Sequence, residues 1–167
     1  MNNSVISHSI QFLILVLLQI AVLNNINFLG DINPYLYIIF ICLFPINNNR
    51  VTFIFLSFLL GLSIDLFSDS GGVHAAASVT IAFIRPVILK FCFGSIYEHQ
   101  TIKFTQVDFG AKIIYFIIMI LIHHLILFSL EIFNLSNIIL VLKKTLFSGI
   151  FTLILCVITT IIFSRKK

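Results

Sequence analysis

Charged residues are scarce in this chain, and tryptophan is absent. Only 10% of the 167 residues are Asp, Glu, Lys or Arg, whereas a soluble domain has about 25%. Hydrophobic residues make up 60%, against roughly 45–50% in a soluble domain. A soluble domain of this length still exposes about 30% of its unfolded surface, which so few charges cannot cover. The composition excludes a soluble globular domain and a disordered chain, and it predicts an integral membrane protein with almost no part outside the bilayer.

Cysteine is also rare, which excludes a disulfide scaffold. Cys42, Cys92 and Cys156 lie far apart in apolar runs, form no C-x-x-C pair and are odd in number. We expect them to be small side chains in the core or facing lipid. The net charge of +4 comes from scattered or terminal basic residues. They form no basic face with interleaved aromatic residues, so we interpret them as topology signals and expect no nucleic-acid partner.

Long apolar runs predict an all-α, polytopic membrane protein: six transmembrane helices in one bundle, forming a single domain over residues 1–167. Helices are favoured because every backbone group must be satisfied inside hydrocarbon, and the runs lack the alternation of a β-barrel. The second run is short for a span, and a re-entrant segment is the competing interpretation. Residues 134–142 are expected to lie along the membrane interface. The predicted helices are 10–23, 34–46, 51–67, 73–93, 109–132 and 145–163.

The first predicted helix is expected to be retained. Asn-rich residues follow it, where a cleaved signal peptide would have small residues at its cleavage site.

The basic residues predict the orientation. With six crossings, the side of the two chain ends has Arg50, Lys90, Lys103, Lys112 and the tail 165–167, and the opposite side has only Lys143 and Lys144. Cytoplasmic loops carry the excess of Lys and Arg. Both termini are therefore predicted to be cytoplasmic.

Two stripes of small and polar residues mark the third and fourth helices. The first stripe has i, i+4, i+8 spacing, and the second has spacings of 3, 4 and 3, so each lies on one helix face. Small residues let helix backbones pack closely in lipid. We therefore expect the two helices to form a hairpin, stripe against stripe. The stripes are Ser57, Gly61 and Asp65 on the third helix, and Ala75, Ser78, Ala82 and Arg85 on the fourth.

The two charged members of the stripes have different expected roles. Asp65 either orients a helix or contacts a partner, or it simply reaches water before the turn at 68–72. Arg85 lies about 18 Å along its helix from Val73, well below Asp65 in depth, so a direct bridge between the two is not expected. We predict that Arg85 snorkels to the cytoplasmic interface.

No catalytic constellation is present in the sequence. It has no paired-carboxylate motif, no Gly-rich phosphate loop and no nucleophile beside a base. His123 and His124 point about 100° apart on a helix and have no ligand partner at metal-binding spacing, so we expect core histidines. The prediction is a protein that is not an enzyme and that needs no metal or cofactor.

The stretch GLSIDLFSDSGGVHAAA, with Gly61, Asp65, Gly71, Gly72 and Ala75, resembles the MreD family of rod-shape-determining membrane proteins. Asn33, Pro34 and Tyr35 at the start of the second predicted helix are similar to the Bacteroidetes-type versions. Chain length, the six-helix plan and the positive tail extend the resemblance to the whole chain.

The resemblance implies a non-enzymatic scaffold of the cell-wall elongation complex in the bacterial cytoplasmic (inner) membrane. The partners it implies are an MreC-like protein, an MreB-like actin homologue, a RodA-like glycosyltransferase and a class B penicillin-binding protein. It also implies a fold similar to that of the substrate-binding subunits of vitamin uptake transporters.

The alternative function is a small-molecule-binding membrane subunit of an uptake transporter. In that case the polar edges of the first, fifth and sixth predicted helices would line a pocket near the outer face.

Overall fold

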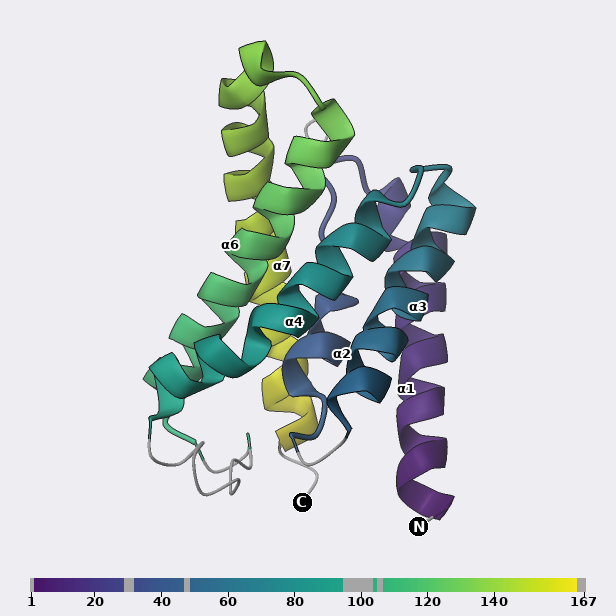
Figure 1. Cartoon of the computed structure of the whole chain (residues 1–167), viewed down its shortest axis with the longest axis vertical. Helices are drawn as coiled ribbons and strands as arrows, with labels where there is room; N and C mark the ends of the chain where they lie inside the picture. Colours follow the sequence, from purple (N-terminus) through teal and green to yellow (C-terminus); the bar gives the residue numbers. More distant parts are fainter. Residues whose placement is uncertain (1, 29–31, 47–48, 95–103, 105–106, 165–167) are drawn as a thin grey trace.

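The computed structural model describes residues 2–28, 32–46, 49–94, 104 and 107–164, and within these ranges the chain is all-α. Two short 3-10 turns, at Leu23–Asn25 and Leu135–Asn137, flank helix ends, and the one extended pairing among the described residues joins Phe28 and Ile32. The helices are α1 (Asn2–Ala21), α2 (Ile38–Leu43), α3 (Arg50–Ser68), α4 (Val73–Phe93), α6 (Phe109–Ile132) and α7 (Ile138–Ser164) (Figure 1).

Polar and apolar side chains are arranged as in a multi-pass membrane protein. In the described chain, five helices are long and apolar enough to cross a membrane, namely α1, α3, α4, α6 and α7. Large apolar side chains such as Phe67, Phe91 and Ile139 are exposed on their outer faces. The buried polar side chains include Gln19, Ser57, Asp65, His74, Ser78, Arg85, His123, His124 and Thr152. This is the reverse of the distribution in a water-soluble domain.

Three of the predicted helices coincide with α3, α4 and α6, but the first and last are longer than predicted. α1 begins at Asn2, and α7 begins at Ile138. The prediction that residues 134–142 lie along the interface is therefore wrong from Ile138 onward. Lys143 and Lys144 continue the helix because lysine is a good helix former. Lys103 and the tail 165–167, on which the predicted orientation partly depends, lie outside the described residues.

The second predicted helix, 34–46, is helical only at α2, which has six residues. The helix ends because Phe44 precedes Pro45 and is forced out of the helical region, with φ −56° and ψ 139°. Residues Pro34 to Phe44 are nevertheless almost entirely buried. The prediction of a full-length helix here is wrong, and a short helix inside a buried irregular segment takes its place.

Side chains from four long helices hold this buried segment. Near its start, Gln19 Nε2 of α1 donates to the Pro34 carbonyl (2.9 Å), and the Tyr35 N–H donates to Thr152 Oγ1 of α7 (2.9 Å). Near its end, Arg85 Nη2 of α4 and Tyr115 Oη of α6 both donate to the Cys42 carbonyl, at 3.1 and 3.0 Å. α2 consequently lies among the long helices (Figure 1).

Helices α3 and α4 form a close hairpin, as the two stripes predicted. A Cβ atom added at Gly61 would lie 2.5 Å from both Ala75 Cα and the His74 carbonyl oxygen. The two backbones are therefore in direct contact, and even alanine at position 61 would force them apart. The turn between the helices uses positive φ at Asp69, Gly71 and Gly72.

The start of α1 and the end of α7 lie at the same end of the bundle. The first turn of α1 and the last turn of α7 are both at the foot of Figure 1, and the α3–α4 turn and the α6–α7 connection are at the top. The described chain thus returns to the end where it starts.

Candidate functional site

Asp65 caps helix α4 from the end of α3. Its Oδ1 accepts hydrogen bonds from the His74 N–H (3.0 Å) and from Ser70 Oγ, and its Oδ2 accepts from the Ala75 N–H (2.8 Å). The N-cap residue of α4 is Gly72, which has no side chain to serve the free N–H groups of the first turn. The Asp65 carboxylate does this instead, and its charge suits the positive end of the helix dipole. Asp65 is buried, so it orients a helix and does not simply reach water.

The other residues of the two stripes lie at the same α3–α4 hairpin or deeper in the bundle. Ser57, Gly61, Ala75, Ser78 and Ala82 are all buried. Ser57 Oγ donates back to the Phe53 carbonyl at 2.9 Å. The stripes are thus engaged in packing within the chain.

Tyr37 links two buried histidines from different helices. Its hydroxyl lies 2.9 Å from His74 Nδ1 of α4 and 2.8 Å from His123 Nε2 of α6. The hydroxyl has one proton, so it donates to one imidazole and accepts from the other. Tyr37 and His123 are fully buried, and His74 is nearly so. This three-residue chain ties the buried segment to α4 and α6.

His124 extends the polar contacts to α7. Its Nδ1 lies 2.9 Å from the Ile120 carbonyl, which can only accept, so Nδ1 carries the proton. Nε2 then accepts from Thr152 Oγ1 at 3.2 Å, and the same oxygen accepts from the Tyr35 N–H. Both histidines are core residues, as predicted. Within the part of the chain that the structure describes, no three His, Cys, Asp or Glu side chains could together hold a metal ion.

We call Tyr37, His74, His123, His124 and Thr152 the polar core. Several buried polar atoms have no hydrogen-bond partner among the described residues: Gln19 Oε1, Ser78 Oγ, His123 Nδ1, Thr145 Oγ1 and Ser148 Oγ. Unpaired buried polar atoms are uncommon in proteins, and polar residues inside membrane helices are expensive and are associated with function. Of these atoms, His123 Nδ1 belongs to the polar core, which is the candidate site for a bound polar ligand.

Arg85 is buried, so the prediction that it snorkels to the interface is wrong. Its Nε donates to Tyr115 Oη at 3.1 Å, and its Nη2 donates to the carbonyls of Cys42 and Phe44. These carbonyls have no partner within the helix because α2 stops before Pro45. The guanidinium supplies the donors they need. As predicted, Arg85 makes no ion pair with Asp65.

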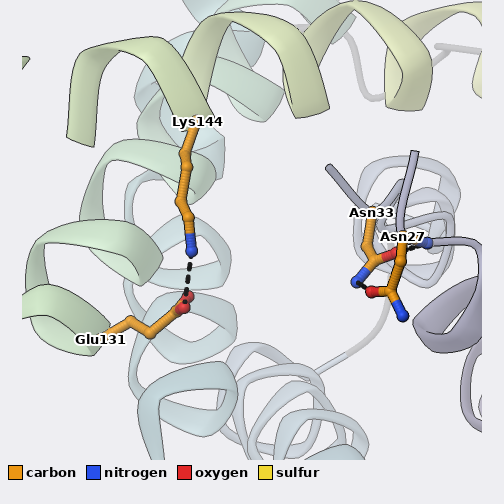
Figure 2. Close-up of polar contacts among 4 residues, drawn as sticks. All are labelled: Asn27, Asn33, Glu131 and Lys144. Atoms are coloured by element: carbon orange, nitrogen blue, oxygen red, sulfur yellow. Dashed lines mark hydrogen bonds and ion pairs between the residues drawn. The ribbon is translucent and has the colours of Figure 1, made fainter. Parts of the chain in front are cut away.

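Figure 2 shows two further polar pairs, one between α6 and α7 and one within the loop region that follows α1. Lys144 Nζ of α7 lies 3.1 Å from Glu131 Oε1 at the end of α6. Asn33 Oδ1 accepts from the Asn27 N–H at 2.8 Å, and Asn33 Nδ2 donates to Asn27 Oδ1 at 3.2 Å. The asparagine pair closes the loop that leads into the buried segment.

Sequence reasoning singled out Asp65, Gly61 and Arg85, and it expected a polar edge on the last helix, where Thr152 lies. It missed Tyr37 and His74. The available signal was two tyrosines, Tyr35 and Tyr37, in an otherwise apolar run. Buried tyrosine hydroxyls usually need a hydrogen-bond partner. The partners were not predictable, because they come from distant parts of the chain.

Compared with models of protein families, with curated proteins and with solved structures, the chain matches none of them. The resemblance to the MreD family rests on the motif that contains Gly61, Asp65, Gly71, Gly72 and Ala75. In the structure these five residues lie together in the α3–α4 hairpin.

Replacing Asp65 by Asn should destabilise the protein by about 1–3 kcal/mol, because the amide NH₂ would face a buried backbone N–H that the carboxylate now satisfies. The thermal midpoint in detergent, followed by circular dichroism, measures the effect. Asp69→Asn is the matched control: Asp69 is exposed and has φ 51°, a conformation that Asn tolerates. Equal midpoints for the two variants would contradict the capping role.

Replacing Tyr37 by Phe removes the hydroxyl that joins His74 and His123, and leaves two buried ring nitrogens without that partner. We expect a loss of stability of about 1–3 kcal/mol, measured by the same thermal midpoint. Tyr35→Phe is the control, because the Tyr35 side chain makes ring contacts but no hydrogen bond through its hydroxyl among the described residues. The account fails here if Tyr35→Phe is as destabilising as Tyr37→Phe.

Proposed function

We propose that this protein is a non-enzymatic membrane scaffold of a bacterial cell-wall elongation complex, similar in role to MreD proteins. The observation that carries the proposal is the α3–α4 hairpin. The motif residues behind the resemblance are the residues that build it: Gly61 lies against Ala75, and Asp65 caps α4. A hairpin fixed in this way holds two spans at one separation and angle, which suits a protein that positions others.

The chain crosses the bilayer six times in this proposal, through five long helices and the buried segment around α2. His74, beside Tyr37, and Arg85, beside Cys42 and Phe44, are separated by about 17 Å of helix rise. The segment therefore passes through much of the bundle's depth. Non-helical backbone is tolerated at membrane depth where protein surrounds it, and this segment is buried. An even number of crossings agrees with chain ends at one end of the bundle (Figure 1).

The distribution of basic residues supports cytoplasmic chain ends in the inner membrane. Arg50 begins α3, Lys90 is in the last turn of α4 and Lys112 is in the first turn of α6. These three helix ends lie at the same end of the bundle as the start of α1 (Figure 1). At the opposite end, Lys144 is paired with Glu131, which reduces the basic excess there. The positive-inside rule then assigns the first end to the cytoplasm.

An MreC-like protein is the proposed direct partner. Because the small-residue stripes are engaged within the chain, a partner helix would contact the outer apolar faces, for example the exposed side chains Ile139, Leu146 and Ile150 of α7. The MreB-like, RodA-like and penicillin-binding partners follow from the resemblance to the family.

A small-molecule-binding subunit of an uptake transporter is the second candidate. The observation that favours it is the set of unpaired polar atoms in the bundle, among them Ser78 Oγ, His123 Nδ1 and Ser148 Oγ. A polar ligand could satisfy such atoms. This candidate requires that a small molecule stays bound through purification.

Co-purification tests the scaffold directly. The tagged protein, extracted from the membranes of its native host in mild detergent, should carry the MreC-like protein, detected by mass spectrometry. Gly61→Leu should reduce its yield severalfold, because the added side chain pushes α3 away from α4. Gly149→Ala is the matched control, since a Cβ there would lie 3.7 Å from Ile120 Cγ2, an ordinary contact. The scaffold proposal is wrong if the unaltered protein never retains the MreC-like protein and instead retains a small molecule.

A further inference from the structure

A pocket of about 200 Å³ lies beside Arg85, between the first turns of α3 and the second half of α4. One water needs only about 15 Å³ of such space, so the pocket has room for a much larger group. Its apolar walls include Pro45, Ile46, Phe53 and Leu89. Two arginines, Arg85 and Arg50, provide its charge.

Arg85 is a buried cation without an anionic partner. Its acceptors are the neutral oxygens of Tyr115, Cys42 and Phe44, and its guanidinium lies over the ring of Phe53 at 5.0 Å. Its Nη1 has no hydrogen-bond partner among the described residues. No carboxylate of the described residues lies within ion-pair distance of Arg85. A guanidinium remains charged in proteins, and a buried charge is costly unless it is paired.

Arg50 places a second cation at the pocket. It is exposed in the first turn of α3, where its Nη2 donates to the Phe83 carbonyl at 3.3 Å and its guanidinium lies over the Phe83 ring. α3 therefore begins near the level of Phe83 on α4, and α4 continues to Phe93. The pocket lies where α4 extends beyond the first turn of α3.

We infer that this pocket binds the phosphate group of an anionic membrane lipid, with Arg85 and Arg50 as its cationic ligands. Arginine presents several donors in a planar fork that matches phosphate oxygens. The apolar walls suit the carbon atoms next to the phosphate. Basic pockets between transmembrane helices on the cytoplasmic side bind anionic lipid headgroups. The choice of a lipid over a soluble phosphate compound rests on the proposed membrane orientation.

Native mass spectrometry of the purified full chain in neutral detergent tests the inference. We expect phosphatidylglycerol to bind at lower concentration than phosphatidylcholine, whose positively charged choline is repelled by Arg50. Arg50→Gln should weaken phosphatidylglycerol binding about fivefold, and Arg85→Gln should weaken it further. Lys143→Gln is the control, because it removes one exposed charge near the other end of the bundle and should change nothing.

Two outcomes would contradict binding of a membrane lipid. Equal binding of the two lipids with no effect of Arg50→Gln overturns the inference. Binding of glycerol 1-phosphate that depends on Arg50, without a preference between the lipids, supports a phosphate site but assigns it to a soluble compound. If Arg85→Gln does not elute as a folded monodisperse species, Arg50→Gln alone decides, since Arg50 lies outside the buried contacts. No partner protein is present, so a failure here is separate from a failure of the scaffold proposal.

Discussion

Hydrogen bonding of one buried segment, in which only the six residues of α2 are helical, ties the long helices together. Residues Pro34 to Phe44 lie inside the bundle, out of reach of water, and backbone groups there must find partners in the protein. Gln19, Thr152, Arg85 and Tyr115 provide them, one from each of α1, α7, α4 and α6. The same need accounts for much of the polarity inside an otherwise apolar chain. Four long helices are thereby hydrogen-bonded to the backbone of one short buried segment.

The α3–α4 hairpin adds a second fixed unit, and the two units meet at His74. The backbone N–H of His74 donates to Asp65, which caps the helix, while its side chain contacts Tyr37 of the buried segment. Helix register in the hairpin and the position of the segment are thus coupled through one residue. In the proposed scaffold role, this coupling would keep the helix faces that partners contact at one geometry. The polar residues of the segment and of the hairpin make hydrogen bonds that join helices to one another.

Local patterns predicted the parts of the fold that depend on neighbouring residues. The apolar runs give the positions of α3, α4 and α6, and the spacing of Gly61 and Ala75 gives the hairpin contact, because both follow from helix periodicity. The segment at 34–46 was not predictable in the same way. An apolar run between two prolines has the same sequence pattern whether it forms a full helix or a buried irregular segment. The acceptors of Arg85 and the partners of Tyr37 come from distant sequence, so the polar core appears only when the chain is folded.

In the proposed topology, the buried segment carries the chain across the bundle, and both chain ends face the same side of the membrane. Single cysteines at Asn3, Ser164 and Asn134, in a variant whose three native cysteines are replaced by alanine, can be labelled with a membrane-impermeant maleimide in spheroplasts and in inverted vesicles. The account predicts that positions 3 and 164 react only in inverted vesicles and position 134 only in spheroplasts. Reaction of positions 3 and 164 from opposite sides would contradict it.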